Sequence, residues 1–125
     1  MTGSFKRWKV ALTLVAAAIA APAAGAGFHD GHKLKEWAEA YDRSLTGEKQ
    51  KPTDTQEVLT FMGYVTGVND ALQGMILCTP PAVKIHELVV VVKKYVRQHP
   101  EMLKRPASHS VIEAISQAYP CKPKK

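Results

Sequence analysis

The chain has 125 residues, of which 17 are lysine or arginine and 11 are aspartate or glutamate, giving a net charge of +6. This length allows one hydrophobic core and is too short for two ordinary domains. Three of the basic residues and none of the acidic ones precede residue 27, so residues 27–125 hold 14 basic and 11 acidic residues, a net charge of +3. These bases form no stripe interleaved with aromatic residues, which argues against nucleic-acid binding.

Residues 1–26 have the pattern of a cleavable signal peptide. Lysine and arginine are followed by an apolar run at 10–21 and then by small residues. The run is too short to span a bilayer, and no second hydrophobic segment supports an uncleaved anchor. Cleavage is expected after Ala26, with Ala23 as the alternative, and no cysteine follows either site for lipid attachment. We expect residues 27–125 to be one exported domain, periplasmic or secreted, without stable membrane insertion.

The first predicted helix covers about residues 32–45. Its apolar residues recur at helical spacing, with charged residues between them. They are Leu34, Trp37, Ala38, Tyr41 and Leu45. A polar stretch at 46–52, which ends in proline, predicts a loop after this helix.

The second predicted helix covers about residues 54–77, and Thr53 with Gln56 predicts a capping box at its start. Its inward-facing residues are expected to be Val58, Phe61, Met62, Val65, Val68, Leu72 and Ile76. Gly63, Gly67 and Gly74 share one face of this helix, and each costs about 1 kcal/mol relative to alanine. We therefore expect another helix of the same core to approach that face closely. A membrane-helix interpretation is disfavoured by the polar residues at 69, 70 and 73.

The third and fourth predicted helices follow consecutive prolines at 80 and 81, which cannot continue the second helix. The third is expected to end near His99 and Pro100, and its apolar residues are Val83, Ile85, Leu88, Val89, Val92, Tyr95 and Val96. The β-branched run at 88–92 could suggest a strand, but the pattern continues at helical spacing. After a turn at 104–106, the fourth helix is expected to place Val111, Ile112, Ile115 and Tyr119 on one side and to end at Pro120 and Cys121.

Cys78 and Cys121 are the two cysteines of the chain. In an exported protein, an even cysteine count predicts a disulfide rather than metal ligands or a redox nucleophile. Closing this segment stabilises a fold by about 4 kcal/mol through loss of loop entropy in the unfolded chain. The predicted fold class is therefore all-α: a small four-helix domain in which one disulfide joins the end of the second helix to the end of the fourth.

The sequence lacks several motifs typical of enzymes. It lacks a zinc-protease helix motif, a nucleophile elbow and a glycine-rich phosphate loop. His86, next to Glu87, and His99 lie at opposite ends of the third predicted helix, and His109 lies in the first turn of the fourth. Histidines so scattered are typical of solvated positions. We predict no catalytic residue, no cofactor and no metal site, with one possible exception.

The exception is a copper site at the amino terminus. If cleavage follows Ala26, the mature chain begins with Gly27, Phe28 and His29. An amino terminus with histidine third can bind Cu(II) in a square plane through the amine, two deprotonated amides and the imidazole. Asp30 and His32 could add weak contacts.

An ordered series of segments carries a family resemblance. The segments lie at 63–70, 78–80, 88–95, 99–101, 106–107 and 118–121. Together they resemble the Rap/Tai family over roughly residues 57–121, with Leu34 and Trp37 agreeing more loosely. Members of this family are small exported helical immunity proteins of type VI secretion. The resemblance implies that residues 27–125 form an immunity domain that neutralises a cell-wall amidase delivered by neighbouring bacteria.

The chain departs from that family at one place. Family members often have a second cysteine pair that links the first two helices, and the matching positions here are Ala38 and Phe61. We therefore expect packing of Trp37, Tyr41 and Phe61 to hold the first helix in place.

The resemblance implies stoichiometric inhibition, in which the protein covers the cleft of a peptidoglycan amidase and does no chemistry of its own. Its partner-binding residues are unknown; the exposed, charged segments 46–53 and 100–106 are candidates. Similar proteins form homodimers, and the sequence neither requires nor excludes one. Two alternatives stay open: an acid-activated, chaperone-like periplasmic protein, and an envelope protein of another role on the same fold.

Overall fold

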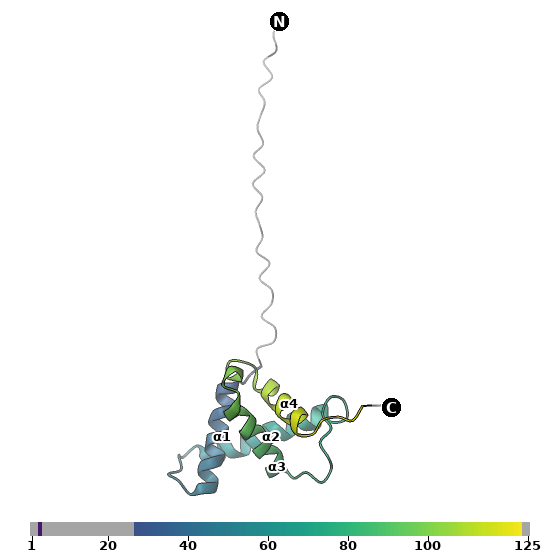
Figure 1. The fold of residues 1–125 in the computed structure, drawn as a ribbon. Helices are drawn as coiled ribbons and strands as arrows, with labels where there is room; N and C mark the ends of the chain where they lie inside the picture. Colours follow the sequence, from purple (N-terminus) through teal and green to yellow (C-terminus); the bar gives the residue numbers. More distant parts are fainter. Residues whose placement is uncertain (1–2, 4–26, 124–125) are drawn as a thin grey trace.

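The computed structural model describes Gly3 and residues 27–123, so the predicted signal peptide lies, apart from Gly3, outside the described residues. The described chain forms four α-helices and one short 3₁₀ helix (Figure 1). In chain order they are α1 (Gly31–Thr46), α2 (Asp54–Leu72), α3 (Ile85–Gln98), η1 (Pro100–Met102) and α4 (Ala107–Ala118). The predicted all-α, four-helix fold is confirmed. No helix in the described part of the chain has the length and apolar content needed to cross a membrane.

Helix α1 has the expected bounds and cap signals. Asp30 is its N-cap, and the Asp30 carboxylate accepts a hydrogen bond from the Lys33 amide at 3.0 Å. Gly47 ends the helix with φ of 67°, a left-handed conformation that glycine adopts without strain. Leu45, the last residue of the predicted apolar pattern, does not face the core, because it is 63% exposed. The chain leaves the core at this point, and residues 44–53 are all exposed.

One hydrophobic core joins the four helices. Tyr41 of α1 packs edge-on against Phe61 of α2, with 6.1 Å between the ring centroids. The fully buried apolar side chains come from every helix and from the turn after α2. The largest are Phe61, Leu34, Leu77, Ile115, Val65, Val89, Val92 and Val111. The packing predicted to hold α1 against α2 is therefore present.

Helix α2 is shorter than predicted, because it ends at Leu72 and not near Leu77. Gln73 is extended and Gly74 has φ of 78°, so the chain reverses there. This turn buries Leu77 and leaves Ile76 exposed, contrary to the expectation that Ile76 faces inward. The predicted capping box at Thr53 is also wrong, since the Thr53 side chain makes no cap hydrogen bond.

The predicted close approach to the α2 glycines is wrong. A Cβ atom added at Gly63, Gly67 or Gly74 would meet nothing within 4 Å. The close contact occurs instead at Gly31, where an added Cβ would lie 2.4 Å from the Met102 carbonyl oxygen and 2.6 Å from the Leu103 Cα. Spacing along a helix shows that glycines share a face but cannot show whether that face is covered.

Helix α3 begins at Ile85, so Val83 lies before the helix and not inside it as predicted. The Glu87 carboxylate accepts a hydrogen bond from the Lys84 amide at 2.7 Å, which completes the first turn. The predicted disulfide is confirmed: Cys78 and Cys121 are bonded, with 5.1 Å between their Cα atoms. It joins the turn after α2 to the segment just after α4.

Candidate functional site

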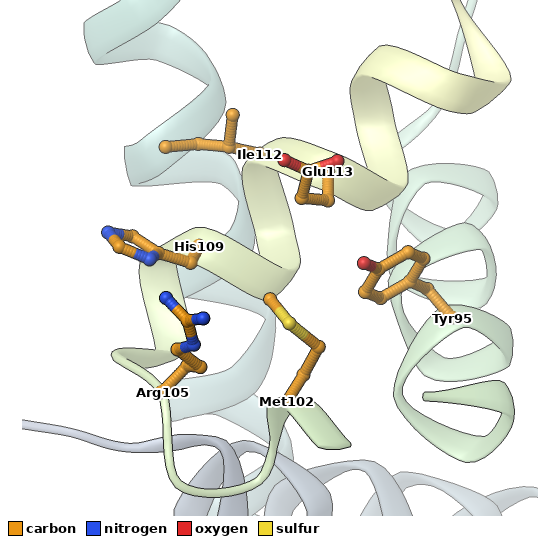
Figure 2. Close-up of a pocket in the computed structure, with 6 residues that line it drawn as sticks. All are labelled: Tyr95, Met102, Arg105, His109, Ile112 and Glu113. Carbon is orange, nitrogen blue, oxygen red and sulfur yellow. The ribbon is translucent and has the colours of Figure 1, made fainter. Parts of the chain in front are cut away.

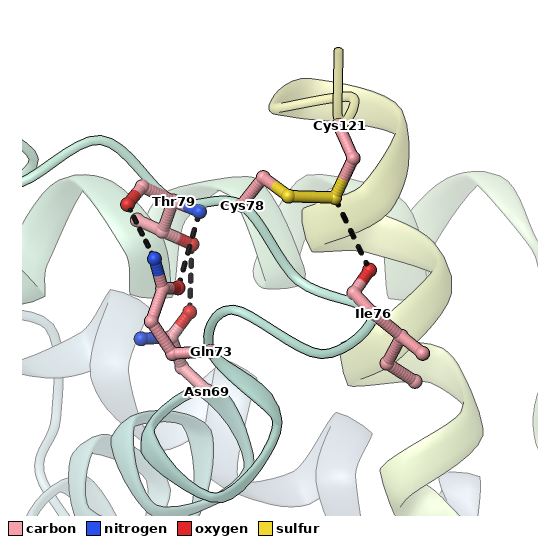
Figure 3. The surroundings of a disulfide bond; sticks show 6 residues. All are labelled: Asn69, Gln73, Ile76, Cys78, Thr79 and Cys121. Atoms are coloured by element: carbon pink, nitrogen blue, oxygen red, sulfur yellow. Dashed lines mark hydrogen bonds between the residues drawn. A yellow bond between two sulfur atoms is a disulfide. The ribbon is translucent and has the colours of Figure 1, made fainter. Parts of the chain in front are cut away.

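The turn between α2 and α3, residues 73–79, is called the disulfide loop below. Figure 3 shows it beside the end of α4, with the Cys121 sulfur 3.7 Å from the Ile76 carbonyl oxygen. Backbone hydrogen bonds close the turn: the Leu72 carbonyl accepts from the Leu77 amide at 3.1 Å, and the Leu77 carbonyl accepts from the Gly74 amide at 2.8 Å. The loop is therefore tied both covalently and through its backbone.

Polar side chains stiffen the disulfide loop further. The Gln73 amide group donates to the Thr79 carbonyl at 2.9 Å and accepts from the Thr79 amide at 3.2 Å. The Thr79 hydroxyl donates to the Asn69 side-chain oxygen at 2.6 Å (Figure 3). Asn69, Gln73 and Thr79 thus join the last turns of α2 to the chain beyond the disulfide.

The tip of this stiffened loop exposes two large apolar side chains. Met75 is 75% exposed and Ile76 is 53% exposed. Apolar side chains held out on a rigid backbone can bind a partner without a large loss of conformational entropy. Sequence reasoning assigned Ile76 to the core and gave Met75 no role. Gly74 could have identified the loop, because a glycine commonly marks the end of a helix.

The candidate segment 100–106 is also held in place, by backbone contacts to the start of α1. The Arg105 carbonyl accepts from the Gly31 amide at 2.9 Å, and the Leu103 carbonyl accepts from the His32 amide at 3.0 Å. The Ala107 amide donates to the His29 carbonyl at 2.8 Å. The absence of a side chain at Gly31 lets the two segments meet this closely.

A groove of about 360 Å³ lies between α3, this turn and α4. Figure 2 shows its six lining side chains, with the Arg105 guanidinium beside the His109 imidazole and with Glu113 near Tyr95. The six are Tyr95, Met102, Arg105, His109, Ile112 and Glu113. Burial raises the pKa of Tyr95, and the charges of Glu113 and Glu101 add to this effect. The groove therefore combines an apolar floor with charged groups on its walls.

The other candidate segment, 46–53, is tied at its end by a buried ion pair. Asp54 is only 2% exposed, and its carboxylate accepts two hydrogen bonds from Arg43, at 2.7 and 2.9 Å. It also accepts one from the Lys51 amide at 2.8 Å. The Arg43 hydrogen bonds, aided by the Lys51 amide, lower the pKa of Asp54 to about 2 despite its burial.

A second ionic contact ties α1 to α3. Asp42 pairs with Lys93 at 2.6 Å and with Arg97. The Lys93 ammonium also lies over the Tyr41 ring, 5.6 Å from its centroid. These contacts help to hold α1 in place. The family resemblance places a second disulfide at positions 38 and 61, where this chain has the buried apolar residues Ala38 and Phe61.

The histidines do not form a cluster. His99 stacks on Tyr95, with 4.0 Å between ring centroids, and lies 2.7 Å from the Glu101 carboxylate. The His29 imidazole packs edge-on against Trp37 and Tyr64. Among the residues that the structure describes, no group of three or more histidine, cysteine, aspartate or glutamate side chains could hold a metal ion. The amino-terminal copper site depends on a free terminus at Gly27 and stays a prediction.

The fold and these surfaces define a small helical domain with exposed side chains on rigid turns. Comparison with protein families gives a more specific result: the family model of the Rap1a immunity proteins matches residues 27–121. The chain belongs to the Rap1a immunity protein family. The match begins at the first residue after the predicted signal peptide and ends at Cys121. No curated protein matches the chain.

Proposed function

We propose that this chain is a periplasmic immunity protein that binds a peptidoglycan amidase effector of type VI secretion and inhibits it without chemistry of its own. Membership of the immunity family supports a role against an effector. The resemblance to the Rap/Tai proteins supports the amidase as its target. In this proposal residues 1–26 are removed on export, and mass spectrometry of periplasmic protein is expected to find Gly27 as the first residue.

The observation that carries the proposal is the apolar tip of the disulfide loop. Met75 and Ile76 are exposed, while the loop beneath them is fixed by the disulfide and by the Gln73 and Thr79 hydrogen bonds. An inhibitor needs shape and a few apolar anchors that become buried on binding. A loop already held in one conformation can supply those anchors at low entropic cost. Met75 and Ile76 are the proposed anchors.

The test begins with titration of a panel of secreted peptidoglycan amidases against the mature domain. One amidase is expected to lose activity at an equimolar amount of this protein. If none of a broad panel binds, the inhibitor proposal is wrong and an envelope role on the same fold replaces it.

Two variants then locate the contact surface. Met75→Ser with Ile76→Ser is expected to weaken inhibition by about a hundredfold, the loss typical of two anchors. Leu59→Ser is the control, because Leu59 is also a large apolar residue, 64% exposed, but lies on α2 away from the loop. It should inhibit as the unmodified chain does. If the loop variant also inhibits normally, the disulfide loop is not the contact surface.

A further inference from the structure

The groove between α3, η1 and α4 contains an arginine side chain that makes no ion pair within the described residues. Of the three arginines in the described part of the chain, Arg43 pairs with Asp54 and Arg97 pairs with Asp42. Arg105 makes no ion pair with any described residue, and its side chain lines the groove beside His109. A guanidinium presents a fork of donors that matches a carboxylate. The fold leaves this fork free for a ligand.

The walls of the groove are positioned before any ligand binds. The Arg105 carbonyl accepts a hydrogen bond from Gly31 and its amide donates to the Met102 carbonyl at 3.0 Å, so the backbone beneath the guanidinium is fixed. On the opposite wall, Tyr95 is only 8% exposed and stacks on His99, which is itself held by Glu101. The groove therefore requires little ordering when a ligand enters.

The floor between these walls is apolar. Met102 and Ile112 are half-buried, and Figure 2 shows the Met102 thioether between the Arg105 and Tyr95 sides. A volume of about 360 Å³ accommodates one or two side chains and is small for a folded element. Glu113 also lines the groove, on the Tyr95 side in Figure 2, so its charge disfavours a ligand carboxylate on that side. The complementary ligand carries a carboxylate at the Arg105 side next to an apolar side chain.

We infer that this groove binds a peptide segment of the effector in which a carboxylate, held by Arg105 and His109, lies beside an apolar side chain that packs on Met102 and Ile112. That the bound peptide belongs to the effector rests on the proposed function. The groove and the disulfide loop lie near the two ends of α4, which at 1.5 Å per residue are roughly 15–20 Å apart. One interface of standard size can span that distance. The effector would then have two separate contacts, an apolar one and a charged one.

The first test uses a minimal probe and needs no effector. Mature, isotope-labelled protein is titrated with N-acetyl-leucine, which carries a carboxylate beside an apolar side chain, and with N-acetyl-leucine amide, which lacks the charge. At millimolar concentrations the acid is expected to shift the amide resonances of residues 102–113 and to bind at least about tenfold more tightly than the amide. Equal responses to the two probes, or no response at these residues, would overturn the inference.

Two variants assign the response to the groove. Arg105→Gln is expected to reduce binding of N-acetyl-leucine at least about tenfold. Lys104→Gln removes a neighbouring charge that does not line the groove, and it should bind as the unmodified protein does. The spectra report at once whether each variant is folded. Weaker binding of N-acetyl-leucine to both variants would overturn the inference, because the probe would then respond only to the overall charge of this surface.

The same variants separate this inference from the proposed function. Once an inhibited amidase is known, Arg105→Gln should weaken inhibition about tenfold and Lys104→Gln less than about twofold. If the amidase is inhibited equally by both variants, the groove is not an effector contact although the inhibitor proposal stands. If no amidase is inhibited but N-acetyl-leucine binds in the groove, the carboxylate site exists and the effector is the wrong occupant.

Discussion

The two exposed turns of this domain are held by different means. The disulfide loop is fixed by a covalent bond and by hydrogen bonds of the Gln73 and Thr79 side chains. The turn at 100–106 is fixed by backbone hydrogen bonds to the start of α1, which are possible because Gly31 has no side chain. The first depends on particular side chains, and the second depends on the absence of one. The disulfide loop should therefore be disturbed by removing side chains, and the turn at 100–106 by adding a side chain at Gly31.

The largest effect is expected from removing the disulfide. The double variant Cys78→Ala with Cys121→Ala should lower the free energy of unfolding by about 4 kcal/mol, because the unfolded chain regains the entropy of an open loop. Denaturant unfolding monitored by circular dichroism measures this, and the unmodified protein under reducing conditions is the control. A loss below about 1 kcal/mol would mean that the side-chain hydrogen bonds hold the loop without the covalent bond.

The next largest effect is expected at Gly31. Gly31→Ala places a methyl group 2.4 Å from the Met102 carbonyl oxygen, so the turn at 100–106 must shift. We expect a loss of about 1–3 kcal/mol in thermal or denaturant unfolding. Gly63→Ala is the matched control, because its new methyl group meets nothing within 4 Å. It should stabilise α2 by up to about 1 kcal/mol. Equal effects of the two variants would contradict the close contact at Gly31.

A smaller effect is expected from loosening the disulfide loop while the covalent bond stays intact. Gln73→Ala removes both hydrogen bonds to the Thr79 backbone and should cost about 1 kcal/mol. Its clearer signature is hydrogen exchange, since the Thr79 amide loses its acceptor and should exchange faster. Gln117→Ala, an exposed glutamine of α4, serves as the control. Unchanged protection of Thr79 would show that the Gln73 side chain does not order the loop.

The smallest effect concerns how the stability provided by the ion pair of Arg43 and Asp54, at the end of segment 46–53, changes at acidic pH. Because hydrogen bonds from Arg43 lower the pKa of Asp54 from 3.8 to about 2, its contribution to stability is present above about pH 4 and is lost as pH falls towards 2. The melting temperature of Asp54→Asn should therefore lie below that of the unmodified protein at neutral pH, and the gap should narrow below about pH 4. A gap that is constant down to about pH 2 would contradict this assignment. The disulfide contributes equally throughout, since it does not titrate.

Local sequence patterns predicted the helices well and their ends less well. The apolar spacing of α1 is strong, and the structure places that helix within one residue of the predicted bounds. The end of α2 was missed because Met75, Ile76 and Leu77 continue an apolar run that periodicity alone cannot distinguish from helix. Gly74, at φ of 78°, ends it instead. This error hid the most exposed apolar pair of the disulfide loop.

The candidate surfaces were predictable only in part. Segment 100–106 was identified from its expected exposure and its charge, and Met102 and Arg105 do line the groove. Tyr95 and Glu113 could not be added, because their meeting depends on how α3 crosses α4. The Arg43 to Asp54 pair was missed for the same reason, since nothing in a linear pattern distinguishes a buried carboxylate from a solvated one.

The sequence by itself determined the helical class, the order of the four helices and the single disulfide, because periodicity, prolines and cysteine count act locally or by simple pairing. Within the described residues, the tertiary structure alone decided which glycine is crowded, which isoleucine is exposed and which arginine makes no ion pair. These properties depend on what lies across from each residue in space. That is set by the packing of whole helices, and the spacing of residues along one helix does not contain it.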